Sequence, residues 1–100
     1  MADLTNAEIR ALKARGQLLD PALRVGKDGL TPQFLATLDQ MFHHHELLKV
    51  KFDYFKEQKR ELAPQLAEKS GSRLIMQVGN VVLLYRPKPT EPDAISAEDQ

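Results

Sequence analysis

Cysteine is absent from this chain of 100 residues. Without thiols, the chain can form neither a disulfide framework nor a thiolate metal site. Long apolar runs are missing as well, because the longest, Val81–Tyr85, is far too short to cross a bilayer. The first residues show no basic segment followed by an apolar one, so they do not resemble a signal peptide. We therefore expect a cytoplasmic protein that makes no membrane contact.

The formal net charge is zero, but the charged side chains are distributed unevenly along the chain. Residues 1–86 contain 13 basic and 10 acidic side chains, whereas residues 87–100 contain one lysine against four acids. The basic body is a weak indication of a polyanionic partner. The last stretch is rich in proline and acid, which predicts a disordered tail over 88–100 that follows one domain over 1–87. Such a tail either only aids solubility or competes weakly with the polyanion.

Two helices have clear start signals. Thr5 and Glu8 form a capping box, and Gly16 is the expected left-handed stop of this first helix. Thr31 caps the second helix, with Pro32 at its first position. Its apolar residues follow helical spacing and predict one buried face: Phe34, Leu35, Leu38, Met41 and Phe42.

A third helix is predicted over about 56–70. Gly71 is placed to end it, and Pro64 implies either a kink or a late start. Its expected buried residues are Leu62, Leu66 and Ala67.

Four strands are predicted between and after these helices, over 21–25, 48–52, 74–78 and 81–86. The last two are joined by Gly79-Asn80, a strong hairpin signal. The order α-β-α-β-α-β-β predicts a compact α/β domain in which helices pack on a four-stranded mixed sheet. A chain of this length supports one modest core.

The first candidate site is the loop Gly26-Lys27-Asp28-Gly29, which enters a capped helix. Glycines let backbone N–H groups approach a phosphate, and the helix N-terminus and Lys27 add positive charge. The negative charge of Asp28 would repel a bound phosphate. The loop is either a phosphate-binding device or a plain strand-to-helix turn.

A second candidate is the pair Lys49 and Lys51, which point to one strand face while Leu48, Val50 and Phe52 point to the other. This pair either contacts a phosphate backbone or forms a solvated face. Together with Arg24 and Lys27 it could make a continuous positive surface.

Catalytic and metal sites have little support. His43, His44 and His45 are consecutive, and consecutive helical side chains diverge by about 100°, so they cannot converge on one ion while helical. The serines lie near turns or in the tail without a nucleophile motif, and no nucleotide-cofactor fingerprint is present. We expect no enzyme activity, no cofactor and no metal.

Read in order, three blocks resemble the CRM domain family, named for chloroplast RNA splicing and ribosome maturation, and most closely its bacterial stand-alone, YhbY-like members. The blocks are VGKDGLT at 25–31, HELLKVKF at 45–52 and VGNVVLLYRP at 78–87. The resemblance covers about 4–87. Asp28, the histidine run, Pro64 and the acidic tail depart from what we expect of the family.

This resemblance implies a fold similar to the C-terminal domain of bacterial translation initiation factor three. It implies RNA binding and association with precursors of the large ribosomal subunit. The residues that it assigns to RNA are Gly26, Lys27, Asp28, Gly29, Lys49, Lys51 and Arg86, of which the last could instead cap the sheet edge. Arg24 is added as an expected RNA contact because it could extend the positive face of Lys27, Lys49 and Lys51. With few aromatic residues for base stacking, we expect structured RNA bound mainly through phosphates, by a monomer.

Two other classes remain open. A protein–protein adaptor would show a large exposed apolar patch, whereas an RNA-binding protein would show a continuous positive face. A small hydrolase would need a deep pocket with converging catalytic groups.

Overall fold

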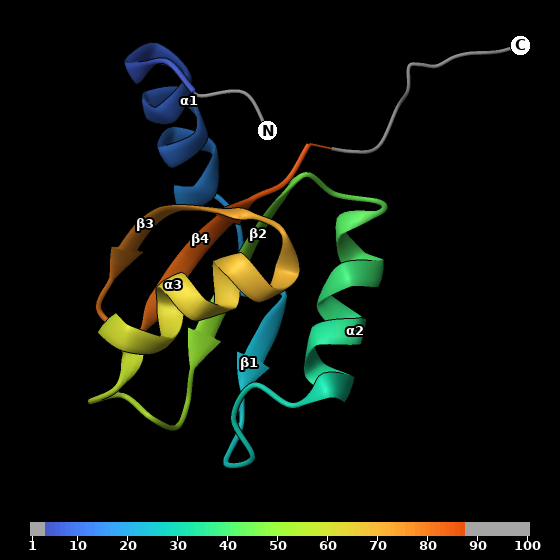
Figure 1. Cartoon of the computed structure of the whole chain (residues 1–100). Helices are drawn as coiled ribbons and strands as arrows, with labels where there is room; N and C mark the ends of the chain where they lie inside the picture. Colours follow the sequence, from blue (N-terminus) through green and yellow to red (C-terminus); the bar gives the residue numbers. More distant parts are fainter. Residues whose placement is uncertain (1–3, 88–100) are drawn as a thin grey trace, which may run out of the picture.

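The computed structural model describes residues 4–87, and the predicted tail at 88–100 lies outside the described residues (Figure 1). The elements follow the predicted order: α1 (Asn6–Gln17), β1 (Leu23–Val25), α2 (Pro32–Phe42), β2 (Leu47–Phe52), α3 (Lys59–Ser70), β3 (Arg73–Val78) and β4 (Val81–Tyr85). The predicted α/β class with a four-stranded mixed sheet is thus confirmed. Over this part of the chain, no helix is long and apolar enough to span a bilayer.

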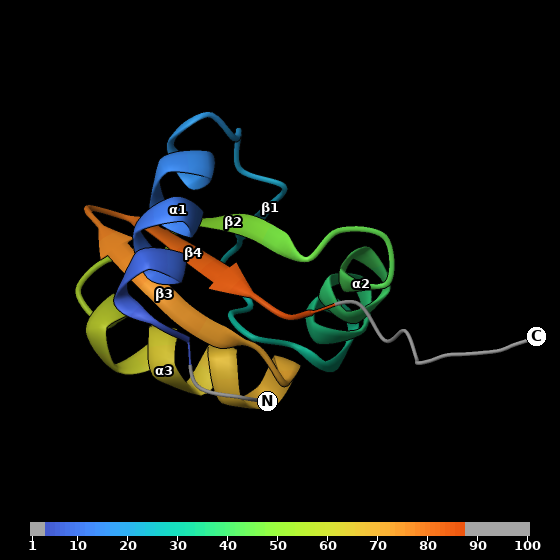
Figure 2. The ribbon, with the colours of Figure 1, turned by 90° about the horizontal axis from the view of Figure 1, so that it is seen from above.

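The sheet has the strand order β1-β2-β4-β3. β1 runs parallel to β2, and the other two pairings are antiparallel. α1 lies on one face of the sheet and α3 on the other, as Figure 2 shows from above. α2 shares the α3 face, because Leu38 and Phe42 belong to the same buried cluster as Ala63 and Leu66.

The main core fills the space between the sheet and the helices α2 and α3. Strand residues alternate between faces, so every second residue of β2 enters this core while Lys49 and Lys51 point to the α1 face. The prediction for the two faces of this strand is therefore confirmed. The buried members are Val25, Leu38, Phe42, Leu48, Val50, Phe52, Ala63, Leu66, Ala67, Val82 and Leu84.

A smaller core lies under α1, where Leu12 packs against Leu47 and Leu83. Gly16 belongs to this contact, and the prediction that it stops the helix was wrong. α1 continues to Gln17, and Gly16 is buried against the side chain of Leu83, whose Cδ1 would lie 2.8 Å from an added Cβ. The glycine is there because a larger residue would push α1 away from the sheet.

Helix ends follow the local signals. The Thr5 hydroxyl accepts from the Glu8 N–H at 3.1 Å, and the Glu8 carboxylate accepts from the Thr5 N–H at 2.8 Å. Gly71 ends α3 with φ +66°. α3 starts late, at Lys59, and contains Pro64, which is exposed and cannot donate the helical hydrogen bond to the Arg60 carbonyl.

β3 contains one extra residue relative to β4. Leu74 pairs with Leu84 and Met76 pairs with the next residue, Leu83, so Ile75 is a bulge. Ile75 and Met76 both pack toward the α1 core. The bulge therefore changes which face each later residue of β3 occupies.

Candidate functional site

Three connections meet at one end of the sheet. Because β1 and β2 are parallel, the loops that follow them leave from the same edge, at the bottom of Figure 1. The backbone N–H groups of Asp53 and Tyr54 donate to the Val25 carbonyl at 3.2 and 3.3 Å, and the Phe52 N–H donates to the Asn80 carbonyl at 2.7 Å. We call residues 26–29, 53–58 and 79–80 the three-loop end.

The first of these loops is a tight turn. The Gly29 N–H donates to the Gly26 carbonyl at 3.1 Å, and Gly29 has φ +76°, a conformation that favours glycine. Lys27 and Asp28 are exposed at the tip. α2 starts directly afterwards, with the Thr31 hydroxyl accepting from the Phe34 N–H at 3.0 Å. The loop therefore presents a lysine next to the positive end of a helix dipole.

Arg24 and Lys51 are neighbours across the parallel pairing of β1 and β2. The Arg24 guanidinium pairs with Asp53 at 3.0 Å, so part of its charge is neutralised. Within residues 4–87, no such partner is found for Lys27 or Lys51. These two lysines carry the available charge among the residues expected from the sequence.

Lys49 has a structural contact. Its ammonium group donates to the Leu19 carbonyl at 2.7 Å and so fixes the connection between α1 and β1. A lysine that holds a backbone carbonyl has fewer donors left for a phosphate, although the contact is exposed.

Lys56, in the second loop, and Lys59 and Arg60, at the start of α3 beside it, are basic residues that the sequence analysis missed. Lys56 lies in the second loop, and the Lys59 ammonium donates to the Asn80 side chain at 2.9 Å. Arg60 is exposed beside the β3–β4 hairpin. The parallel pairing of two predicted strands was the signal that could have found them, because it brings the loop after β2 to the glycine loop.

Arg86 lies at the opposite end of β2, where its N–H donates to the Glu46 carbonyl at 2.8 Å. Its guanidinium donates to the Asp39 carboxylate at 2.8 Å and to the Ser70 carbonyl at 2.9 Å. The side chain is only 17% exposed. The hydrogen bond from Arg86 lowers the pKa of Asp39 below its usual value. The structure thus places this expected RNA-binding residue apart from the other seven and in contact with both α2 and α3.

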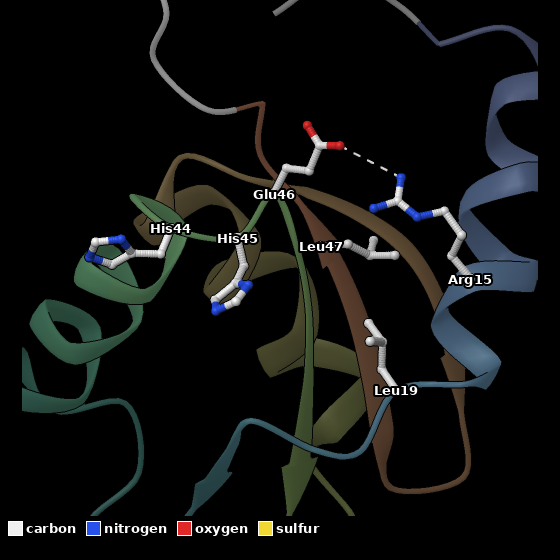
Figure 3. Close-up of a pocket in the computed structure, with 6 residues that line it drawn as sticks. All are labelled: Arg15, Leu19, His44, His45, Glu46 and Leu47. Carbon is white, nitrogen blue, oxygen red and sulfur yellow. Dashed lines mark ion pairs between the residues drawn. The ribbon is translucent and has the colours of Figure 1, made fainter.

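The histidine run borders a shallow pocket of about 220 Å³ near the end of α2 (Figure 3). His44 and His45 point in different directions, and Arg15 extends from α1 to pair with Glu46 at 3.6 Å. His43 instead lies 3.4 Å from Asp39. Across residues 4–87 there is no group of three or more His, Cys, Asp or Glu side chains that could hold a metal ion.

Together, the fold and the three-loop end define a small α/β domain that carries a glycine-flanked lysine loop directly before a capped helix. Comparison with known proteins gives the family. The chain belongs to the CRS1 / YhbY (CRM) domain family, whose model matches residues 4–86.

Bacterial and plant proteins are among those similar to this chain. A probable RNA-binding protein of Pseudomonas aeruginosa is 36% identical over 91 residues, which cover 88% of each chain. A probable RNA-binding protein of Bacillus subtilis is 30% identical over 84 residues, with 83% of this chain and 88% of the relative covered. The maize chloroplast CRS2-associated factor 2 is 34% identical over 90 residues, which are 89% of this chain but 15% of that protein.

A solved structure has the same fold. The solution structure of a Staphylococcus aureus protein, described as an RNA-binding candidate, superposes with a TM-score of 0.74 at 28% identity. The superposition covers 89% of this chain and 94% of that one. The resemblance derived from the three sequence blocks is thus confirmed at the level of family and fold.

Proposed function

We propose that this protein binds RNA through the three-loop end and acts on precursors of the large ribosomal subunit in the cytoplasm. The observation that carries the proposal is the meeting of the glycine loop with the loop that carries Lys56, at the carboxyl ends of β1 and β2. Family membership supports RNA as the partner, because several relatives are named as RNA-binding proteins. The ribosomal part rests on the resemblance to the bacterial stand-alone members.

Lys27, Lys51, Lys56 and Arg60 are the proposed phosphate contacts. All four lie at or beside the three-loop end. Within the loops themselves Lys27 and Lys56 stand against three acids, and the positive excess comes from the adjoining strands and the start of α3, which hold Arg24, Lys51, Lys59 and Arg60 against Glu61. Lysine and arginine contacts to phosphate position RNA without reading its sequence. Arg86 is left out of the proposed interface because its guanidinium is already used inside the fold.

Salt dependence tests the RNA proposal directly. If about five phosphates are contacted, log K should fall against log salt with a slope of roughly −3.5 to −4.5. The affinity would then fall on the order of 100-fold or more between about 50 and 200 mM salt. The measurement is fluorescence anisotropy with a labelled ribosomal RNA fragment. A flat salt profile, or no binding at low salt, contradicts the proposal.

Crosslinking in cells tests the ribosomal part. RNA crosslinked to the protein should map to large-subunit ribosomal RNA, and the protein should co-sediment with precursor particles more than with finished subunits. Crosslinks spread over messenger RNA would contradict assembly as the function while leaving RNA binding intact.

An adaptor function is favoured by a different surface. α1 leaves part of its sheet face uncovered, and an open, mostly apolar groove of about 320 Å³ lies there. Its lining residues are Gln17, Lys49, Met76, Val78, Val81 and Leu83. A Val78→Glu variant that keeps RNA affinity but loses association with pre-ribosomal particles would favour this second function.

A further inference from the structure

Two aromatic side chains are exposed at the three-loop end. Tyr54 is 52% exposed and Phe55 is 38% exposed, and both lie in the loop after β2, following Asp53. The chain has only six aromatic residues, and the other four pack on the two cores or lie within them: Phe34, Phe42, Phe52 and Tyr85. A pair of neighbouring aromatics left in water is therefore the exception in this molecule, and large exposed apolar groups often mark binding sites.

The backbone holds Phe55 in an unusual conformation. Its φ is +60°, and it is the only residue other than glycine with positive φ in the described part of the chain. For a bulky aromatic residue this conformation is strained, and such strain is found most often at functional sites. The hydrogen bond from the Gln58 N–H to the Phe55 carbonyl, at 3.0 Å, holds the turn that follows.

The position of the Phe55 ring connects this loop to the glycine loop. A Cβ added to Gly29 would lie 3.4 Å from Cε2 of Phe55, so the ring lies directly against the glycine backbone. Next to it, residues 53–58 line an open pocket of about 370 Å³ that includes Lys56. One nucleotide needs a cation for its phosphate and a flat apolar surface for its base, and the two loops supply both side by side.

We propose that Tyr54 and Phe55 stack on an unpaired base of an RNA strand whose backbone lies along the Gly26–Gly29 loop. The proposal rests on the proposed RNA-binding function and makes it more specific. A base within a duplex is already stacked on its neighbours, whereas bases in single-stranded loops and ends are free to stack on aromatic side chains. The expectation of an interface dominated by phosphates is thereby revised: the ligand has an unpaired nucleotide beside its charged backbone.

The test compares two labelled RNAs with the same number of phosphates, a hairpin with an unpaired loop and a blunt duplex. The variants are Tyr54→Ala, Phe55→Ala and Tyr54→Phe, and Leu18→Ala is the matched control because Leu18 is an exposed apolar residue before β1. Each variant is checked for unchanged melting by circular dichroism. Affinity is measured by anisotropy at several salt concentrations.

Each alanine variant should lose on the order of 10-fold in affinity for the hairpin, with no change for the duplex and no change in salt slope. Tyr54→Phe should keep the hairpin affinity, because the ring remains. The stacking proposal would be overturned if the alanine variants lost the same affinity for both RNAs, or if their affinity for the hairpin did not change. An unchanged hairpin affinity would indicate that Tyr54 and Phe55 contact a protein instead. If the wild-type protein binds neither RNA, the proposed RNA-binding function is wrong. If the wild-type protein binds but the variants bind equally well, only the stacking proposal is wrong.

Discussion

The guanidinium of Arg86 lies over the ring of Phe42, with its central carbon 4.8 Å from the ring centroid. The same group donates hydrogen bonds to Asp39 on α2 and to the last residue of α3, Ser70. One side chain at the end of β4 therefore links both helices of the main core.

Arg86→Lys should destabilise the protein although the charge is kept. A lysine ammonium lacks the planar shape that allows simultaneous stacking and hydrogen bonding, so we expect a loss of about 1–3 kcal/mol in the free energy of unfolding. The measurement is urea denaturation, with Arg60→Lys as the exposed control. At a temperature where the wild type and Arg86→Lys are both folded, their RNA affinities should be equal. A loss of RNA affinity without a loss of stability would show that Arg86 contacts the RNA.

Acid should weaken the Asp39 contact. Arg86 lowers the pKa of Asp39 in the folded protein. The contact therefore stabilises the fold fully when the pH is above 3.8, the ordinary pKa of an aspartate. This stabilisation is lost as the pH falls through the lower pKa that Asp39 has in the folded protein. Wild type should therefore exceed Asp39→Asn in melting temperature near neutral pH, by a small amount because the carboxylate is exposed. This difference should vanish in strong acid. A difference that stays constant with pH would show that the charge of Asp39 has no part in it.

Lys27→Ala and Asp28→Asn should shift RNA affinity in opposite directions. Both side chains are exposed, so each change should alter stability by less than about 0.5 kcal/mol. Removing Lys27 should weaken binding and reduce the salt slope by roughly 0.7–0.9, which is one phosphate contact. Removing the acid should tighten binding. Equal affinities for both variants and wild type would place the RNA away from this loop, most plausibly beside Lys51.

Gly16→Ala should destabilise the fold even though alanine favours helices. The added Cβ would overlap the Leu83 side chain, and overpacking of this kind costs about 1–3 kcal/mol. Gly26→Ala is the matched control, because its Cβ would meet nothing within 4 Å. Thermal melting of both variants decides the matter. Equal melting temperatures would mean that α1 moves freely enough to accept the methyl group.

Phe55→Gly should have a small effect on stability, within about 1 kcal/mol. Glycine adopts positive φ without strain, and the relief, about 1–3 kcal/mol for such a conformation, offsets the contacts that the half-exposed ring loses. Chemical denaturation measures this effect. A loss as large as that of a buried phenylalanine, about 3–5 kcal/mol, would show that the ring is a core residue.

The elements of the fold were predictable because their signals are local. The capping box at Thr5 and Glu8, the Thr31 cap and the left-handed Gly71 each depend on residues only a few positions away. Gly16 was misread because its true neighbour, Leu83, is distant in sequence and adjacent only in the folded sheet. A glycine near a helix end has the same sequence signature whether it ends the helix or allows close packing.

The site was predictable only in part, for the same reason. The glycine loop and Lys51 could be read from spacing alone. The position of Lys56 and Arg60 near the glycine loop depends on which strands pair in parallel, and the contacts of Arg86 depend on Asp39 and Ser70, which come from two other elements. The exposed aromatic pair at Tyr54 and Phe55 has no local signal, because burial is a property of the whole fold.

The extra residue in β3 also bears on how this sequence can change in length. Since Ile75 lies between Leu74 and Met76 without a pairing partner of its own, β3 carries one residue more than its register with β4 requires. Loss of Ile75 would leave Met76 opposite Leu83, and the residues after Met76 would keep the partners and the faces that they have now. Loss of a residue from β4 would instead shift the pairing and turn the side chains beyond it to the other face. Homologous chains should accordingly vary in length at the bulge more readily than in β4.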